Sequence, residues 1–453
     1  MPDDKLEDLR QKASTGEIDT VLVCLVDMQG RLMGKRFHVQ NFLDHAHAET
    51  HCCNYLLATD LEMATPEGYR ATSWESGYGD YTMRPDASTI RPLPWLEGTA
   101  MVLCDLEDHE AHAPVAHAPR QMLKGQIARL AERGLAPMMA TELEFFLFEG
   151  TARENREAGF RNLRPHVEHN QDYAIQLSTR DEVVMRPLRN MLYAAGIEVE
   201  CSKGEAETGQ EELNLRYQDA LSCADYHTIA KHAAKDIAAA QGLTASFLPK
   251  WHADKVGSAS HVHCSLFRDG ENAFHDPARP MGKSALMDHF VAGLLKYAPD
   301  YTVFLAPYVN SYKRFRKGTF APTKAVWSVD NRTAGFRMCG AGTKGVRIEC
   351  RIGGSDMNPY LAQAAMLAAG LAGIEEELAL PDPISGDIYA NDGAANVPTT
   401  LREATETLRG SAMLRAAFGD GVVDHYARAA EVEQEAFDAA VTDWEISRGF
   451  ERC

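Results

Sequence analysis

The sequence predicts an α+β fold, with a small β-rich domain at the N-terminus and a larger domain in which helices accompany an antiparallel sheet. Three observations support this prediction. The chain has 453 residues, which is enough for a large core and more than one domain. Strand patterns dominate the first hundred residues, and helical periodicity follows from residue 119 onward. Four later segments carry polar side chains at strand spacing, which predicts a sheet with one polar face.

The N-terminal part begins with two strands. Residues 20–27 form the first strand, Met28-Gln29-Gly30 forms a turn, and residues 31–38 form the second. Residues 78–95 contain several prolines and are predicted to be rich in loops, while residues 102–105 return to strand. The repeated Ala, His and Pro of residues 109–119 predict a linker.

The second part opens with a helix. Pro119 suits a first helical turn and Gly134 ends the apolar stripe. A strand over residues 138–148 follows. Further helices are predicted at residues 184–195, 224–241, 282–297, 359–378 and through most of 401–449.

The bulk composition excludes several classes of partner. The chain has 46 basic and 65 acidic residues, a net charge of −19, which argues against nucleic acid and anionic membrane surfaces. The N-terminus is acidic without an apolar core, and no apolar run approaches the roughly 20 residues of a membrane helix. The ten cysteines include no CxxC pair. We therefore expect a soluble, reduced, cytoplasmic protein.

One region departs from this acidic average. Residues 311–352 contain ten basic residues and only two acids, Asp330 and Glu349, so the local balance is 10 − 2 = +8. A basic island in an acidic chain is a candidate site for a small anion. The alternative is a solvated surface patch, although such patches usually mix both signs.

Four segments combine alternation with chemically active side chains: TELEFFLF (141–148), KGEAETGQEELNL (203–215), HVHCSLF (261–267) and RIECR (347–351). Because a strand sends alternate side chains to opposite faces, Leu143, Val262 and Ile348 are expected in the core. The opposite faces carry carboxylates, imidazoles and guanidinium groups. Cys264 and Cys350 alternate with these residues and are interpreted as core fillers.

These residue types suit metal-dependent phosphoryl chemistry. Five carboxylates and an imidazole in one cavity would be costly unless cations joined them, and oxygen-rich ligation suits Mg²⁺ or Mn²⁺. Arginines facing the same cavity need an anion between them and the metals, and the phosphates of ATP fit. No Walker motif is present. The alternatives are a solvated ExE strand, a structural HxH pair, and arginines that only pair with carboxylates.

The chain resembles the glutamine synthetase superfamily from about Glu17 to the C-terminus. The resemblance rests on the order and spacing of TELEFFLF, GEAETGQEELNL, GSASHVHCSL, NSYKRF, DNRTAGFR, RIECR and NPYLAQAAMLAAGL. It implies a β-grasp-like N-terminal domain at residues 1–112 and an ATP- and metal-dependent catalytic domain at residues 113–453. It further implies a homo-oligomer, a dodecamer of two stacked hexameric rings, with active sites formed between neighbouring subunits.

The resemblance also implies roles for individual residues. For the metal nearer the amino acid the matching ligands are Glu144, Glu205 and Glu212, and for the metal that bridges ATP phosphates they are Glu142, His261 and Glu349. Arg314 and Arg351 match residues that hold glutamate and its γ-phosphate, and Gly257 matches a glycine whose backbone meets the substrate amino group. The positions that match nucleotide contacts are Arg332, Arg337, Lys344, Arg347, Ser265 and His263.

The chain departs from the ammonia-using members at one loop. Those members carry a glutamate in a motif like GYEAP, which closes the site and helps bind ammonium. The matching stretch here is residues 318–322, and Phe320 replaces the glutamate. A phenyl ring cannot accept a proton, but it offers apolar and cation–π contact to an organic ammonium. The FDGSS motif of the N-terminal domain is also absent, and Asp80 is a better substitute for its aspartate than Asp60.

The sequence therefore predicts a carbon–nitrogen ligase that joins the γ-carboxylate of glutamate to an organic amine through a γ-glutamyl phosphate. This resembles the branch that makes γ-glutamyl-polyamines, -alkylamides or -anilides, and Phe320 favours an apolar or aromatic amine. The alternatives are an ammonia-dependent glutamine synthetase and a non-catalytic regulatory homologue. A guanidino-kinase-like activity is disfavoured because Arg314 and Arg351 are retained.

Overall fold

The structure is a computed structural model that describes residues 2–391 and 395–453. Its N-terminal part is built on one mixed sheet, ordered β2-β1-β6-β4-β3, with β5 paired to β6. The strands are β1 (Thr20–Val26), β2 (Leu32–His38), β3 (Thr50–Cys53), β4 (Asp80–Pro85), β5 (Arg91–Pro92) and β6 (Thr99–Asp108). Strands β1 and β6 are parallel and the other pairs are antiparallel. Helix α1 (Pro2–Ser14) precedes the sheet and α2 (Val39–Asn41) follows β2.

A second sheet forms the centre of the larger part, with the order β14-β15-β16-β12-β7-β9-β8 and with β10, β11 and β13 paired at its margins. Among the strand pairs that the structure describes in this sheet, only β14 and β15 run parallel. The strands are β7 (Ala136–Glu149), β8 (Val199–Gly204), β9 (Gln210–Leu215), β10 (Gln218–Asp219), β11 (Leu243–Ser246), β12 (Val262–Arg268), β13 (Glu271–Asn272), β14 (Trp327–Val329), β15 (Phe336–Cys339) and β16 (Arg347–Cys350). Leu143, Val262 and Ile348 are buried, as their alternation predicts.

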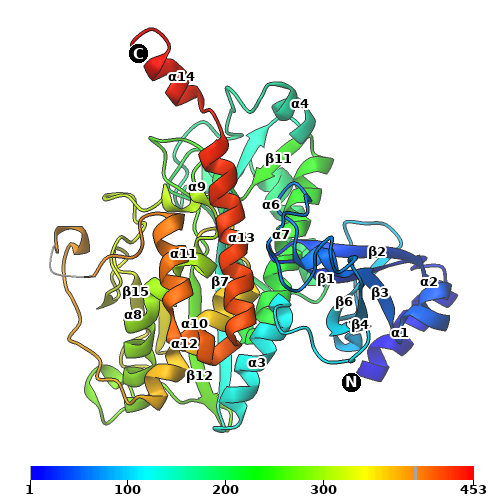
Figure 1. The fold of residues 1–453 in the computed structure, drawn as a ribbon, viewed down its shortest axis with the longest axis horizontal. Helices are drawn as coiled ribbons and strands as arrows, with labels where there is room; N and C mark the ends of the chain where they lie inside the picture. Colours follow the sequence, from blue (N-terminus) through cyan, green and yellow to red (C-terminus); the bar gives the residue numbers. More distant parts are fainter. Residues whose placement is uncertain (1, 392–394) are drawn as a thin grey trace.

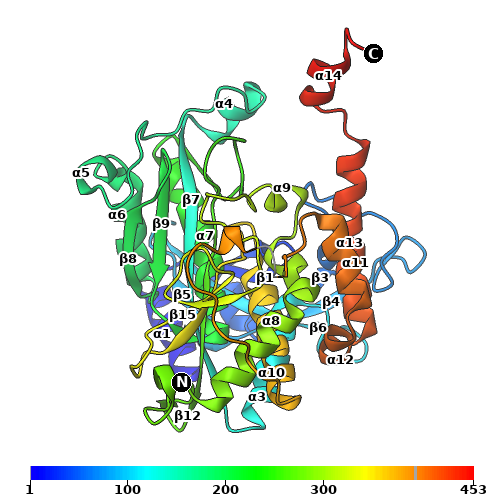
Figure 2. The ribbon, with the colours of Figure 1, turned by 90° about the vertical axis from the view of Figure 1, so that its left-hand side faces the viewer.

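Helices accompany this sheet. They are α3 (Pro119–Ala131), α4 (Ala152–Glu157), α5 (Ile175–Ser178), α6 (Glu182–Ala194), α7 (Ala220–Ala240), α8 (Ala285–Leu305), α9 (Val309–Tyr312), α10 (Pro359–Glu375), α11 (Leu401–Gly410), α12 (Ala412–Phe418), α13 (Asp420–Ala439) and α14 (Asp443–Gly449). Figures 1 and 2 show the larger part beside the N-terminal sheet, with α3 and α7 nearest to it in Figure 1. The α+β prediction is confirmed. Within the described residues, no helix has both the length and the apolar character required to cross a membrane.

Helices α8 and α10 cross at glycines. A Cβ on Gly293 would lie 2.2 Å from the carbonyl oxygen of Ala369, and one on Gly373 would lie 2.2 Å from that of His289. Because no side chain fits there, the two backbones approach closely. Helix α10 is buried along nearly its whole length and forms the centre of the core.

Polar contacts join the two parts. Arg120 at the start of α3 is 4% exposed and pairs with Asp86 and Asp105 of the N-terminal part and with Asp225 of α7, at 2.8, 2.6 and 3.2 Å. Breaking one of these pairs would leave a buried charge, which is strongly destabilising. The Asn358 amide, at the start of α10, donates to the carbonyl oxygen of Asp27 at 3.0 Å.

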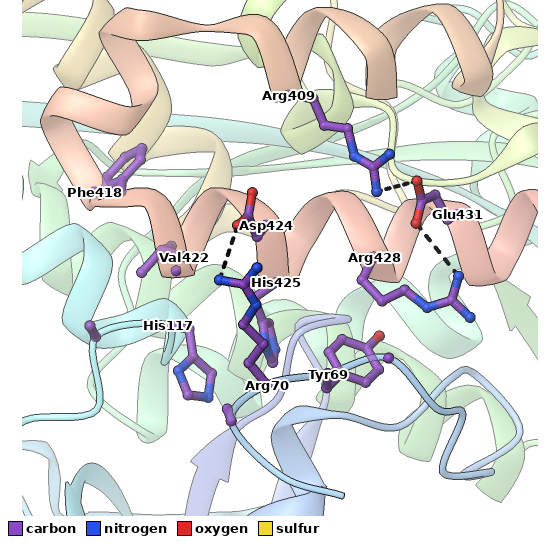
Figure 3. Close-up of a pocket in the computed structure, with 14 residues that line it drawn as sticks. Tyr69, Arg70, His117, Arg409, Phe418, Val422, Asp424, His425, Arg428 and Glu431 are labelled. Atoms are coloured by element: carbon purple, nitrogen blue, oxygen red, sulfur yellow. Dashed lines mark ion pairs between the residues drawn. The ribbon is translucent and has the colours of Figure 1, made fainter.

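A further contact lies where α13 meets residues 68–71, across a cavity of about 820 Å³ (Figure 3). His425 Nε2 donates to the Leu57 carbonyl oxygen at 2.7 Å, and its ring stacks on His117 with centroids 4.3 Å apart. Arg409 and Arg428 both pair with Glu431. The hydrogen bond from His425 to Leu57 joins the N-terminal part to α13, and the two pairs with Glu431 link α11 to α13 and brace α13 itself.

Some predicted elements differ from the observed ones. Helix α1 was not predicted, and β4 lies inside the stretch predicted to be rich in loops. The helix predicted to end at residue 297 continues to Leu305, because Pro299 is accommodated inside α8. The prediction of a domain boundary after residue 112 stays a prediction.

Candidate active site

The register of the larger sheet places the polar side chains opposite one another. Glu144 of β7 pairs with Glu212 of β9, and Lys203 of β8 pairs with that same Glu212. On the other side of β7, His263 of β12 pairs with Glu349 of β16. Neighbouring strands therefore bring groups from distant parts of the sequence onto one face.

The first cluster contains Glu144, Glu205 and Glu212, which each offer an oxygen within 4.8 Å of the others. Glu205 is not on a strand but in the turn between β8 and β9. The Ala259 backbone N–H donates to Glu144 at 2.7 Å, which fixes that carboxylate from β12's side of the sheet.

The electrostatics of this cluster favour a bound cation. Burial, and then the charges of Glu205 and Glu212, raise the pKa of Glu144 well above its ordinary value. Burial, followed by Glu142 and Glu205, raises the pKa of Glu212 to about 8. A divalent cation would remove this repulsion.

The second cluster contains Glu142, His261 and Glu349, again with donor atoms within 4.8 Å of one another. His261 Nδ1 lies 2.6 Å from one Glu142 oxygen, and His263 Nε2 donates to the other at 2.8 Å. Burial alone would raise the pKa of Glu142, but the two imidazoles lower it far below its ordinary value. Burial would likewise raise the pKa of Glu349, which Arg351 instead holds near 2.

The three carboxylates of the first cluster and Glu142 and His261 of the second line one cavity of about 190 Å³, while Glu349 is fully buried next to them. Arg351 donates to Glu349 at 2.5 Å and Arg337 donates to the same carboxylate at 3.1 Å. Arg314 is buried and also lines this cavity, and burial lowers its pKa to about 10. Arg332 lines it too, so four guanidinium groups meet the two carboxylate clusters here.

Gly257 forms part of the wall of the same cavity. A Cβ at this position would lie 2.4 Å from the Pro249 carbonyl oxygen and 2.7 Å from Cγ of Arg314. No side chain can be accommodated without moving the backbone. The glycine therefore keeps the cavity open beside Arg314.

A second cavity of about 500 Å³ adjoins the first, and Glu142 and Glu212 line both. The predicted nucleotide residues His263, Ser265, Lys344 and Arg347 line this second cavity. Arg347 Nε donates to His263 Nδ1 at 3.3 Å, so the N–H of this imidazole is on Nε2. Of the predicted phosphate contacts, Arg332 and Arg337 instead line the first cavity.

Phe320 lies at the rim of the first cavity, 54% exposed, with a φ of +57°. A hydrogen bond anchors the backbone of the next residue: the Tyr389 hydroxyl donates to the Ala321 carbonyl oxygen at 2.9 Å. A ring in this position covers the cavity with an apolar surface.

Asp80, at the start of β4, is exposed. It is absent from the residues that line either cavity in the described part of this chain. The predicted role of Asp80 in a neighbouring subunit's site therefore stays a prediction.

Tyr173, Lys203 and Cys339 are among the residues of this region that were not predicted. Tyr173 and Lys203 line both cavities, with the Lys203 ammonium 4.4 Å from the Tyr173 ring centroid. Cys339 places its sulfur 3.5 Å from Glu349 Oε2. The alternation of Lys203 with Glu205 was visible in the sequence, but a lysine beside glutamates on a strand is usually solvated.

Known proteins resemble this chain over nearly its whole length. Residues 116–449 match the catalytic domain of glutamine synthetase. The chain is 47% identical over 449 residues to gamma-glutamylethanolamide synthetase GlnA4 of Streptomyces coelicolor, covering 99% of this chain and 96% of that protein. It is 34% identical over 435 residues to the glutamate–isopropylamine ligase of a Pseudomonas species, covering 95% of each.

The likeness extends to three dimensions. A solved GmaS–ADP complex aligns with a TM-score of 0.85 at 26% identity, covering 98% of this chain and 99% of the other. Together with the two carboxylate clusters, the arginines and the sheet that carries them, these matches establish that the chain belongs to the glutamine synthetase family.

Proposed function

We propose that this protein is an ATP-dependent ligase that joins the γ-carboxylate of glutamate to a small primary amine. The observation that carries the proposal is Phe320 at the rim of a cavity that otherwise holds two carboxylate clusters and four arginines. The similarity to enzymes named for ethanolamide synthesis and for isopropylamine ligation supports an amine acceptor.

Members of the glutamine synthetase family use ATP and divalent metals. The donor chemistry fits such ions, because one cluster offers three carboxylates and the other offers two carboxylates and an imidazole. We infer that Mg²⁺ or Mn²⁺ occupies both, since these ions prefer oxygen ligands. Bound there, the ions would supply charge neutralisation for phosphoryl transfer.

The residues of the chain suit the two steps. Arg314 and the backbone at Gly257 hold glutamate in the first cavity, and His263, Ser265, Lys344 and Arg347 hold the nucleotide in the second. Arg351, Arg332 and Arg337 lie toward the first cavity, where they neutralise the transferred phosphoryl group. The γ-carboxylate attacks the γ-phosphorus of ATP, ADP leaves, and the amine nitrogen then displaces phosphate from the γ-glutamyl phosphate.

The amine enters past Phe320. Its carbon atoms pack on the ring while its ammonium group meets the ring face and the carboxylates of the cavity. A carboxylate of the cavity takes one proton before the nitrogen attacks, and the departing phosphate takes the second. We further propose a dodecamer of two hexameric rings in which Asp80 completes the amine site of a neighbouring subunit. The exposure of Asp80 and its absence from the lining of either described cavity support a role across an interface.

The test is an amine panel. Purified enzyme receives ATP, glutamate and Mg²⁺ or Mn²⁺ with ammonia, methylamine, ethylamine, ethanolamine, isopropylamine, putrescine or aniline. Phosphate release and the γ-glutamyl product are measured together. At least one amine is expected to exceed ammonia in kcat/KM. Ammonia matching or exceeding every amine would identify a glutamine synthetase, and no acid- and amine-dependent turnover would identify a non-catalytic homologue.

A further inference from the structure

Lys203 is a half-buried cation at the first carboxylate cluster, and the proposed reaction does not use it. It stands at the penultimate position of β8, opposite Glu212. Its ammonium pairs with Glu205 Oε1 and lies 3.2 Å from Asp172 Oδ1. The side chain is 16% exposed. A lysine so placed contributes a positive charge inside the cluster.

The contacts of this lysine are those of an ion pair. Its ammonium donates to Glu205 Oε1 and lies 3.2 Å from Asp172 Oδ1. The Tyr173 ring packs against it, and Glu212 is its cross-strand neighbour.

The ion pair engages one oxygen of a carboxylate that a metal would bind, so the ammonium and the metal compete for the same negative charge. Glu205 Oε1 accepts from Lys203, and Glu205 Oε2 accepts from the backbone N–H of Ala206 at 2.8 Å. The backbone donor is fixed by the turn, but the lysine side chain has four rotatable bonds. A divalent ion that binds Glu205 together with Glu144 and Glu212 would therefore displace the ammonium rather than the turn.

The displaced ammonium has partners to receive it. Asp172 Oδ1 and the carbonyl oxygen of Gly204 both lie 3.2 Å from Lys203 Nζ, and the Tyr173 ring lies on another side. Lys203 also lines both cavities, so a small rotation leaves it partly solvated at their boundary. Displacement thus avoids a buried, unpaired charge.

We propose that Lys203 is the internal counter-cation of the Glu144–Glu205–Glu212 cluster, and that a divalent metal must displace it from Glu205 to bind. The lysine then neutralises the cluster in the metal-free protein and sets the metal concentration at which the site fills. This inference depends on the proposed function only in taking the three carboxylates as metal ligands.

The test measures metal binding directly. Full-length protein is stripped of metal and titrated with Mn²⁺, and free Mn²⁺ is read by its electron paramagnetic resonance signal. Glu205→Gln identifies which binding belongs to this cluster. We expect Lys203→Met to bind Mn²⁺ at that site at least tenfold more tightly than wild type, whereas Lys203→Arg, which keeps the charge, stays within about threefold.

Lys255→Met is the matched control. Lys255 pairs with Glu207 at 2.9 Å, in the same turn as Glu205, so its removal changes the net charge equally without touching the cluster. Its Mn²⁺ affinity is expected to equal that of wild type. Equal tightening in Lys203→Met and Lys255→Met would mean that general charge, not displacement, governs binding, and would overturn the proposal.

The possible failures are distinguishable. Mn²⁺ binding that Glu205→Gln does not weaken would contradict the metal site of the proposed function itself. Binding that Glu205→Gln weakens, with equal affinity in Lys203→Met and wild type, would overturn only the role of Lys203. If Lys203→Met does not fold, wild-type crystals with and without Mn²⁺ decide: an ammonium still within 3.5 Å of a metal-bound Glu205 refutes displacement.

Discussion

Replacing Phe320 with alanine is expected to reduce the preference for alkylamines over ammonia. The ring lines the cavity through which the amine would enter, and 54% of the residue's surface is exposed. Ammonia has no carbon atoms to pack against this surface. The substitution should therefore lower kcat/KM for amines in proportion to their apolar size and leave the ammonia reaction nearly unchanged.

The expected magnitude follows from the area available. Aromatic side chains present roughly 150–250 Å², so about half of that remains for a ligand. Each methylene removed from water contributes about 0.8 kcal/mol. The two carbons of ethylamine then correspond to about 1.6 kcal/mol, or roughly fifteenfold in kcat/KM. The three carbons of isopropylamine give about 2.4 kcal/mol as an upper value.

The backbone conformation at position 320 allows the variants to be compared by their side chains. Phe320 has a φ of +57°, which strains any residue with a Cβ, so alanine, leucine and glutamate replace the side chain at similar backbone cost. Phe320→Leu keeps most of the apolar surface and should retain selectivity. Phe320→Glu should raise the relative rate with ammonia by restoring a carboxylate.

The assay is product formation with ammonia, methylamine, ethylamine and isopropylamine at saturating ATP and glutamate. Circular dichroism and the KM for glutamate control for general damage. Equal losses for all four nitrogen donors in Phe320→Ala would show that the ring only stabilises the loop, and the amine-contact reasoning would fail.

Three further outcomes are expected. Gly257→Ala should raise the KM for glutamate at least tenfold in steady-state kinetics, because its Cβ would meet a backbone carbonyl oxygen at 2.4 Å; an unchanged KM would contradict the predicted contact. Glu212, with a pKa raised to about 8 from 4.5, keeps its proton in the folded metal-free protein while the unfolded chain loses it. Stability of the metal-free protein should therefore fall as pH rises from about 5 to about 8, and scanning fluorimetry should find a larger Tm increase from Mn²⁺ at pH 8.5 than at pH 6; an equal or smaller increase at pH 8.5 would contradict this. Finally, Asp80→Ala and Glu205→Gln subunits, inactive alone, should regain activity when unfolded and refolded together if each site combines two chains; no recovery in verified mixed oligomers would argue for sites within one chain.

The alternation of polar and apolar residues along strands identifies most of the site residues that could be predicted from the sequence without the family resemblance. The alternation at Glu142 and Glu144 and around His261 and Glu349 reflects strands whose other faces are buried. The structure places Glu142, Glu144 and His261 in the lining of one cavity and Glu349 beside Glu142 and His261. The partition of the carboxylates into two clusters came from the family resemblance. Periodicity alone cannot assign it, because the assignment depends on which strands are neighbours.

Other features depend on contacts that no local pattern encodes. Glu205 joins its cluster from a turn, where strand alternation does not apply. Tyr173 lines both cavities, and its own φ is +54°. The sequence gives no sign that a tyrosine adopts a positive φ at this position. The continuation of α8 past Pro299 depends on packing against α10, which offsets the missing hydrogen bond.

The carboxylates that would serve acyl activation and the residue that would contact the amine lie on different kinds of structure. Glu144, Glu212 and Glu349 sit on central strands whose registers are fixed by buried neighbours, so changing one of them disturbs the sheet. Phe320 sits on a loop that Tyr389 anchors through the next residue's backbone, not through the ring. A new side chain at position 320 therefore leaves the strands and the anchor intact. On this geometry, amine preference can change by single substitutions while acyl activation by ATP is retained, and Phe320 variants should alter nitrogen-donor selectivity far more than the KM for ATP.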